Sequence, residues 1–275
     1  MGAKMKIWRA AQYALLGVAA VVIAFPFVWM VLTALKPESE IVTFPPSLLP
    51  KHWTFDSFVH IWSRVPFLMF FKNSVVFAFG VTLLSLLFDS MAAYAFARLK
   101  FRGRNGLFVL ILIALMLPVQ VTMIPLFIML NDWGWVDTYA GLIIPRATNA
   151  FGIFMLRQFF IGLPGELDEA ARIDGSSELR LFARIILPLA KPAIASLFVF
   201  HLMYNWNDLM WPLIITNSQA MRPLPAGLAL FMGQHVVEYG ILTAGATIAL
   251  APLVIAFLTA QKYFIQGVAF TGLKE

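Results

Sequence analysis

The sequence predicts an all-α, polytopic membrane protein with six transmembrane helices. Hydrophobic residues make up 61% of the 275-residue chain and charged residues only 12%, whereas soluble domains carry about 25% charged residues. The mean hydropathy is +0.83. Six apolar stretches reach the roughly 20 residues that a membrane-spanning helix needs. Because no polar stretch is long enough to bury a core of its own, we expect residues 1–275 to form a single transmembrane domain.

The first predicted span follows Lys4, Lys6 and Arg9 and is free of charge. It is too long for the apolar region of a signal peptide and lacks a convincing small-residue cleavage site, so we interpret it as an uncleaved helix. The second and fifth predicted spans contain Asp89 and Asp208, and the fourth contains Arg146 and Arg157. The six spans are predicted at residues 10–35, 73–97, 105–130, 138–160, 194–216 and 241–264.

The basic residues predict the orientation of these spans. If the termini share one side of the membrane, 14 of the 20 Lys and Arg residues lie on that side and six on the other. Cytoplasmic loops carry the excess of Lys and Arg, so both termini are predicted to be cytoplasmic. The net charge of +6 is explained by residues that flank spans and does not indicate a nucleic-acid partner.

Two longer segments are then predicted on the outer side. Residues 36–72 combine four prolines with Trp53, Phe55, Phe58 and Trp62, a mixture suited to an interfacial aromatic belt or to short helices on the membrane surface. Residues 217–240 form the second segment, which has Pro223 and Pro225 near its start and a short polar tip at residues 232–237.

A polar insert at about residues 162–190 separates the fourth and fifth spans, and its pattern is more specific than that of a simple linker. Acidic residues crowd its first turn, where the helix dipole favours negative charge. Gly175 is suited to a left-handed helix C-cap, and Ser176 or Ser177 to the N-cap of a second helix. That helix carries an apolar stripe at helical spacing, formed by Leu179, Phe182, Ala183 and Ile186. The residues alone are equally consistent with a protein-docking element and with an amphipathic linker on the bilayer.

The spacing of this insert also resembles a known signature. Glu169-Ala170-Ala171, three residues, Gly175, nine residues and Ile185-x-Leu187-Pro188 match the cytoplasmic loop of the membrane subunits of ABC importers. Residues 163–175 are similar to its carbohydrate-importer branch, and within it to the smaller of the two maltose-type permeases. Further similar segments are residues 92–98 with Phe101 and Gly103, residues 157–160, residues 206–213 and Gln266-Gly267.

The resemblance implies a type I ABC importer permease that forms half of a translocation pore in a bacterial or archaeal cytoplasmic membrane. It implies a second, homologous permease, two ATP-binding subunits that carry ATP and Mg, an extracytoplasmic solute-binding protein, and a sugar or sugar phosphate as substrate. No cofactor is then expected in this chain. The residues implied in coupling to the ATPase are Glu169, Ala170, Ala171, Asp174 and Gly175.

The sequence gives no indication of an enzyme. The chain has no cysteine and four histidines, and none of the histidines forms an HExxH pair; nucleophile-elbow and P-loop motifs are also missing. We therefore assign no catalytic and no metal-binding residues, and we expect ATP hydrolysis to occur on a partner subunit.

A candidate substrate pathway lies in the fifth span, because ionisable groups in membrane helices usually face a cavity or a partner. Tyr204 and Trp211 offer rings on which a sugar could stack, and Asn205 and Asp208 could share one helix face. The alternative is a structural hydrogen-bond cluster that joins helices, and the family implies that the partner permease makes most sugar contacts. The candidate residues are Tyr204, Asn205, Asn207, Asp208 and Trp211.

Two further ionisable residues leave alternatives open. Asp89 occupies a position where the family commonly has a small or apolar residue, and we favour an interhelical or intersubunit partner for it over substrate. Arg146 could snorkel to the interface, pair with an acid or attract an anionic substrate. Asp89, Arg146 and Asp208 are also the only candidates for the coupling site of an ion-driven secondary transporter, the rival interpretation, which internal inverted repeats would favour.

Overall fold

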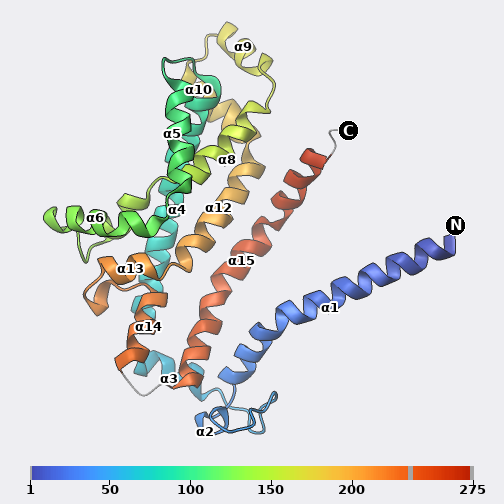
Figure 1. Cartoon of the computed structure of the whole chain (residues 1–275), viewed down its shortest axis with the longest axis vertical. Helices are drawn as coiled ribbons and strands as arrows, with labels where there is room; N and C mark the ends of the chain where they lie inside the picture. The colour runs from blue at the N-terminus through green and yellow to red at the C-terminus, as the bar shows by residue number, and fades with distance from the viewer. Residues whose placement is uncertain (1, 235–237, 273–275) are drawn as a thin grey trace. The chain divides into compact units, whose positions relative to one another are not determined.

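The computed structural model describes residues 2–234 and 238–272, and the regular elements in this part of the chain are all helices. The described chain divides into two compact units, Met1–Leu68 with Leu228–Ala251 and Met69–Gly227 with Pro252–Glu275. The prediction of an all-α fold is confirmed. The helices are labelled in Figure 1.

The first unit contains α1 (Gly2–Ala34), α2 (Glu38–Ile41), α3 (Asp56–Arg64) and the start of α15 (Tyr239–Gly272). The carboxylate of Glu38 accepts hydrogen bonds from the backbone N–H groups of Tyr239 (2.9 Å) and Gly240 (3.0 Å). Those N–H groups have no partner inside their own helix, so Glu38 caps the start of α15. The predicted outer segment 36–72 therefore contains two short helices, and its Trp53 and Trp62 are exposed.

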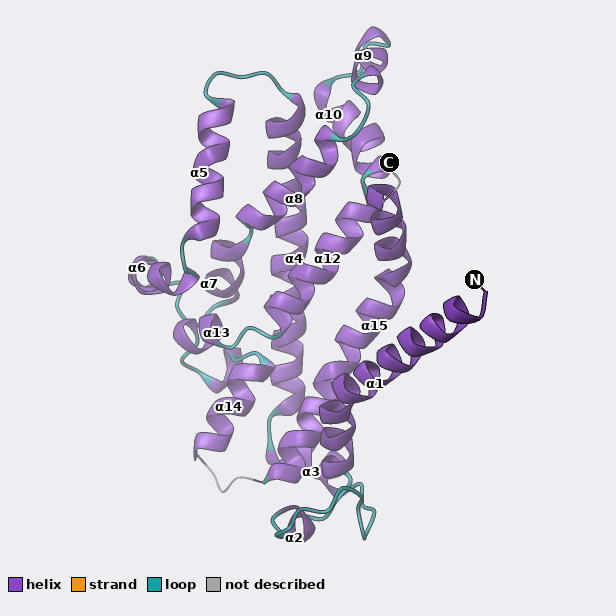
Figure 2. Ribbon diagram, turned by 45° about the vertical axis from the view of Figure 1, so that its right-hand side comes forward, coloured by secondary structure: helices purple, strands orange, loops and turns teal. Residues whose placement is uncertain are grey.

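In the second unit, α4 (Phe67–Arg98), α8 (Ala150–Ile161) and α12 (Lys191–Trp206) lie side by side, as Figures 1 and 2 show. α4 contains the whole second predicted span, and α5 (Arg104–Met116) also packs against α8. The hydrophobic cores of this unit lie between these helices, where apolar side chains are removed from solvent and lipid.

The third predicted span is not one helix. It divides into α5 and α6 (Val119–Asp132), which meet at an angle of 100°. Pro118 provides the physical reason: its ring disfavours helical backbone in the preceding residue, and Leu117 is extended at φ −80° and ψ 126°. Figure 1 shows α6 turning away from the direction of α5.

The fourth predicted span is also interrupted. α7 (Tyr139–Ile143) continues into a 3₁₀ turn, η1 (Ile144–Arg146), and α8 begins only at Ala150. Asn149 is extended and its side chain accepts a hydrogen bond from the backbone N–H of Phe151 at 2.8 Å. Asparagine is among the preferred N-cap residues, so a new helix starts at this point.

The fifth predicted span ends earlier than expected. α12 stops at Trp206 and the short α13 (Met210–Ile215) follows, so Asp208 lies in the connection and not on a helix face. Beyond it lie η3 (Gln219–Met221) and α14 (Leu224–Gln234). The predicted polar tip of residues 232–237 falls partly on residues 235–237, which lie outside the described part of the chain.

By length and composition, four described helical segments can cross a membrane: Trp8–Ala34, Phe67–Arg98, Tyr139–Ile161 and Tyr239–Thr259. The number rises to six if each of two bent pairs forms one span. One pair is α5 with α6. The other joins Glu178–Leu189 to Lys191–Trp206 at 79°, so the polar insert leads directly into the fifth span.

Candidate coupling site and translocation pathway

The first helix of the insert is α9 (Glu166–Ile173), which begins two residues after Pro164 and carries Glu166, Asp168 and Glu169 in its first turn. Glu169 and Ala170 are exposed, whereas Ala171 is only 5% exposed and packs inside the chain. Of the two alanines that the resemblance implies in coupling, Ala170 is thus on the surface, whereas Ala171 packs against the rest of the chain. Residues that are adjacent in a helix point about 100° apart, which separates these two.

The C-terminus of α9 has the predicted left-handed cap. Gly175 adopts φ +74°, and its N–H donates to the carbonyl of Arg172 at 3.0 Å. The N–H of Ser176 donates to the carbonyl of Ala171 at 2.9 Å, which completes a Schellman motif. Asp174, the C-cap residue, is exposed.

The second helical segment of the insert starts as predicted at Ser177, whose side chain accepts from the N–H of Arg180 at 3.4 Å. It consists of α10 (Glu178–Leu181), a π-helical turn, η2 (Phe182–Ile186), and α11 (Leu187–Leu189). Phe182 and Ile186 are buried as the predicted stripe requires, but Leu179 is 70% exposed and Ala183 is exposed too. Leu181 is buried in their place, because the wider π turn shifts the helical register.

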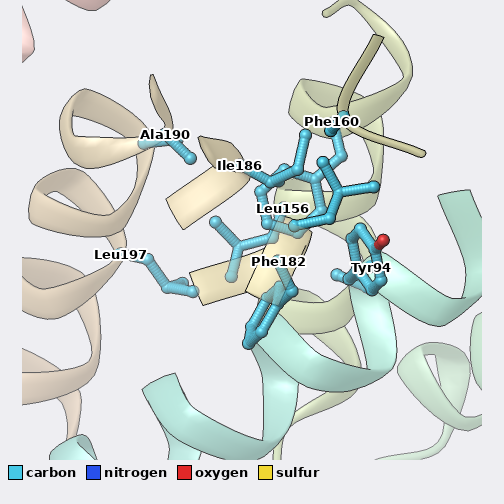
Figure 3. Packing of buried hydrophobic residues seen from close by; sticks show 11 residues of the cluster. Tyr94, Leu156, Phe160, Phe182, Ile186, Ala190 and Leu197 are labelled. Carbon is cyan, nitrogen blue, oxygen red and sulfur yellow. The ribbon is translucent and has the colours of Figure 1, made fainter. Parts of the chain in front are cut away.

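A hydrophobic cluster fixes the insert onto the transmembrane helices. Figure 3 shows Phe182 and Ile186 of the insert among Leu156 and Phe160 of α8 and Leu197 of α12. Ala171 and Leu181 belong to the same cluster. The insert is therefore part of the core of the second unit rather than a free linker.

Polar contacts at the end of α4 hold the first insert helix. The guanidinium of Arg98 donates to the carbonyls of Phe160 and Leu163, both at 2.7 Å. It also lies 3.3 Å from the carboxylate of Asp168, and the side chains of this pair are only 9% and 7% exposed. Arg98 thus ties α4 to the end of α8 and to α9 at once.

A second set of contacts holds α10. Tyr94, one turn before Arg98, donates its hydroxyl to Glu178 at 2.6 Å. Arg172 of α9 donates to the other oxygen of Glu178 at 2.8 Å. These hydrogen bonds, that from Arg172 first, lower the pKa of the Glu178 carboxyl below its usual range. The two insert helices are therefore joined to each other and to α4.

One network joins five residues whose contacts are not predicted from the sequence: Tyr94, Arg98, Asp168, Arg172 and Glu178. In the sequence, Asp168 is one of the acidic residues of the first turn of the insert. Arg98 is one of the basic residues that predict the orientation, and it ends the similar segment 92–98. The available signal was an arginine at the end of an apolar helix, with a tyrosine four residues before it on the same face.

In the candidate pathway, Arg146 pairs with an acid, which is one of the three alternatives given for it. The acid is Asp208. The guanidinium of Arg146 hydrogen-bonds the carboxylate of Asp208, and these side chains are 14% and 11% exposed. The Arg146 guanidinium also lies 5.3 Å from the centre of the Tyr204 ring, within the range of a cation–π interaction. Asp208 therefore makes the structural polar contacts that were the alternative to a place on the substrate pathway.

Arg146 and Tyr204 line a cavity of about 530 Å³ within the second unit, which we call the pathway cavity. Of the five pathway candidates, Tyr204, Asn205 and Trp211 line it, whereas Asn207 and Asp208 do not. Trp211 is 2% exposed and donates its indole N–H to the carbonyl of Leu142, so its ring belongs to the core and is not available for stacking. Asn207 is exposed and donates to the carbonyl of Met203.

Asp89 has the interhelical partners that the sequence analysis favoured. Its carboxylate accepts hydrogen bonds from the Thr148 hydroxyl and the Asn149 N–H, both at 2.8 Å, and lies 3.3 Å from the imidazole of His201. The side chain is 0% exposed. A Cβ at Gly152 would lie 2.1 Å from this carboxylate, so α8 can approach Asp89 only because residue 152 is glycine.

The signal for His201, which the sequence analysis overlooked, was a second ionisable residue within an apolar span. Among the described residues, no group of three or more His, Cys, Asp or Glu side chains is placed to hold a metal ion.

Comparison with known proteins identifies the family. Residues 85–270 match the model of the binding-protein-dependent transport system inner membrane component. The chain belongs to this family. The matched region includes the whole insert and, except for Val81, the residues that line the pathway cavity. The resemblance to ABC importer permeases is confirmed.

Individual relatives agree over nearly the full length of the chain. The arabinooligosaccharides transport system permease protein AraQ of Halalkalibacterium halodurans is 37% identical over 93% of this chain and 92% of its own length. The lactose transport system permease protein LacG of Rhizobium radiobacter is 34% identical over 93% of each chain. The sn-glycerol-3-phosphate transport system permease protein UgpE of Yersinia pestis is 33% identical over 91% of this chain and 92% of its own length.

A solved structure supports the fold. A chain of a bacterial ABC transporter involved in the import of the acidic polysaccharide alginate superposes with a TM-score of 0.83, covering 96% of this chain and 99% of that chain at 24% identity. The fold is therefore shared over nearly the whole length of the chain.

Proposed function

We propose that this chain is one of two permease subunits of an ATP-driven carbohydrate importer. It forms half of the translocation pore, and a second, homologous permease forms the other half. The observation that carries the proposal is the insert, whose exposed Glu169 and Ala170 stand on a helix that is locked to the transmembrane core. A surface of this kind can transmit force, because it cannot move without the helices that hold it.

The ATPase partners bind at this insert in the proposed complex. ATP and Mg reside on those partners, and closure of the two ATPase subunits moves the insert together with α4 and α8. An extracytoplasmic binding protein delivers the solute to the opposite side, and the segment 217–240 is the proposed contact for it. The permeases with similar sequences are named for arabinooligosaccharides, lactose and sn-glycerol-3-phosphate, which supports a sugar or a sugar phosphate as the transported solute.

The test is reconstitution of the complete complex into proteoliposomes with ATP on the side of the insert. Carbohydrate uptake should require ATP hydrolysis and the binding protein. Uptake that persists without ATP and follows an imposed ion gradient would instead establish the secondary transporter. Deleting residues 232–234 should lower uptake while the ATPase still co-purifies; unchanged uptake would remove the outer segment from the proposed contact.

A further inference from the structure

The positive charge on the wall of the pathway cavity is already compensated by a carboxylate. Arg146 is the one Lys or Arg side chain on its wall among the described residues. Its guanidinium is engaged by the carboxylate of Asp208 and by the ring of Tyr204. Because both members of the ion pair are largely shielded from water, solvent screens them weakly. A negatively charged solute drawn to Arg146 would therefore approach a guanidinium whose charge the carboxylate of Asp208 already compensates.

A second carboxylate lies directly beside the wall. Asp89 is bonded to Thr148 and Asn149, and both of these residues line the cavity. Its other neighbour, His201, also lines the cavity. Two carboxylates thus accompany a single guanidinium, and no fixed positive charge on this wall remains to compensate an anionic solute.

The remaining polar lining is suited to hydroxyl groups. A hydroxyl both donates and accepts hydrogen bonds, whereas a carboxylate or phosphate dianion only accepts. The wall offers the amides of Asn149 and Asn205 and the hydroxyls of Tyr204 and Thr122. Amides and hydroxyls can both donate hydrogen bonds to the hydroxyl groups of a polyol and accept hydrogen bonds from them. An aromatic ring beside them adds an apolar face.

We propose that the pathway cavity selects uncharged, hydroxyl-rich solutes, namely neutral sugars, over sugar acids and sugar phosphates. This inference rests on the proposed function and narrows its substrate class. It also assigns Arg146 a role as the positive half of a neutral pair that can donate to a sugar hydroxyl, instead of a receptor for an anion.

The test uses the complete transporter with its ATPase subunits in lipid nanodiscs and no binding protein. Saturation-transfer NMR compares methyl glucoside with methyl glucuronide, which differ by one carboxylate, and with glucose 6-phosphate. The wild-type complex should give at least a fivefold stronger signal from methyl glucoside than from either anion. An equal or stronger signal from an anion would overturn the proposal, as would no signal from any of the three.

Substitutions locate the preference in this cavity. Asp208→Asn leaves Arg146 uncompensated and should lower the glucoside-to-glucuronide ratio at least threefold. Asp132→Asn makes the same chemical change at an exposed residue outside the cavity and should leave the ratio unchanged. If Asp208→Asn does not assemble, Asp89→Asn removes the other carboxylate and should lower the ratio as well. An unchanged ratio in the assembled carboxylate variant would overturn the proposal.

Failure of this inference is distinguishable from failure of the proposed function. A complex that hydrolyses ATP and imports a sugar acid or a sugar phosphate would contradict the inference alone. A chain that associates with no ATPase would contradict the proposed function itself.

Discussion

The guanidinium of Arg98 lies 3.3 Å from the carboxylate of Asp168, and both side chains are buried. This pair joins the last residue of α4 to the helix that carries the exposed Glu169 and Ala170. The same guanidinium holds two backbone carbonyls at the end of α8. A single side chain from another part of the sequence therefore links the candidate coupling helix to both α4 and the end of α8.

Asp168→Asn should loosen α9 without unfolding the membrane helices. Removing one member of a buried ion pair costs about 3–5 kcal/mol because the other charge stays uncompensated; the two carbonyls around Arg98 should keep the cost near the lower end. Co-purification of the ATPase should fall while membrane insertion is retained. Glu166→Gln is the control, since Glu166 is an exposed acid on the same helix. Equal ATPase recovery in both variants would show that the pair does not position α9.

Tryptophan at the two alanines should separate docking from folding. Ala170 is exposed, so Ala170→Trp should block ATPase binding by steric exclusion and leave the thermal stability of the permease unchanged. Ala171 is 5% exposed within the hydrophobic cluster, and Ala171→Trp should destabilise the insert by about 1–3 kcal/mol through overpacking. Thermal unfolding and ATPase pull-down measure the two effects. Normal ATPase binding by Ala170→Trp would remove that face of α9 from the interface.

Gly175→Ala should strain the cap of α9. The left-handed backbone costs a residue with a Cβ about 1–2 kcal/mol, and Gly175→Val should cost more because its Cβ is branched. No atom lies within 4 Å of the added Cβ, so the effect comes from the backbone alone. Weaker ATPase association is the expected readout.

Gly165→Ala provides a matched control for the cap. Gly165 has equally open surroundings but φ −71°, which suits any residue. If Gly165→Ala and Gly175→Ala reduced ATPase association equally, left-handed strain would not be the cause.

Cysteine labelling should establish the orientation of the insert, because the chain contains no cysteine. An impermeant thiol reagent outside intact cells should react with Asn217→Cys and not with Ser177→Cys; both parent residues are exposed. After permeabilisation both should react. Labelling of residue 177 alone in intact cells would reverse the predicted topology.

The sequence by itself determined the all-α fold, the apolar stretches, the family and the residues at which the helices of the insert begin and end. Each of these depends on local chemistry. Gly175 is the residue that accepts φ +74°, and Ser177 is a strong N-cap residue.

Tertiary structure alone decided which faces are buried and which charges meet. Helical periodicity shows that residues share a face, but not whether that face meets the protein, lipid or another chain. It could not show that Ala171 turns inward while Ala170 stays exposed, or that Asp208 lies beyond the end of α12. The Arg98–Asp168 and Asp89–His201 pairs form between helices far apart in the chain, so only the packing of those helices brings their charges together.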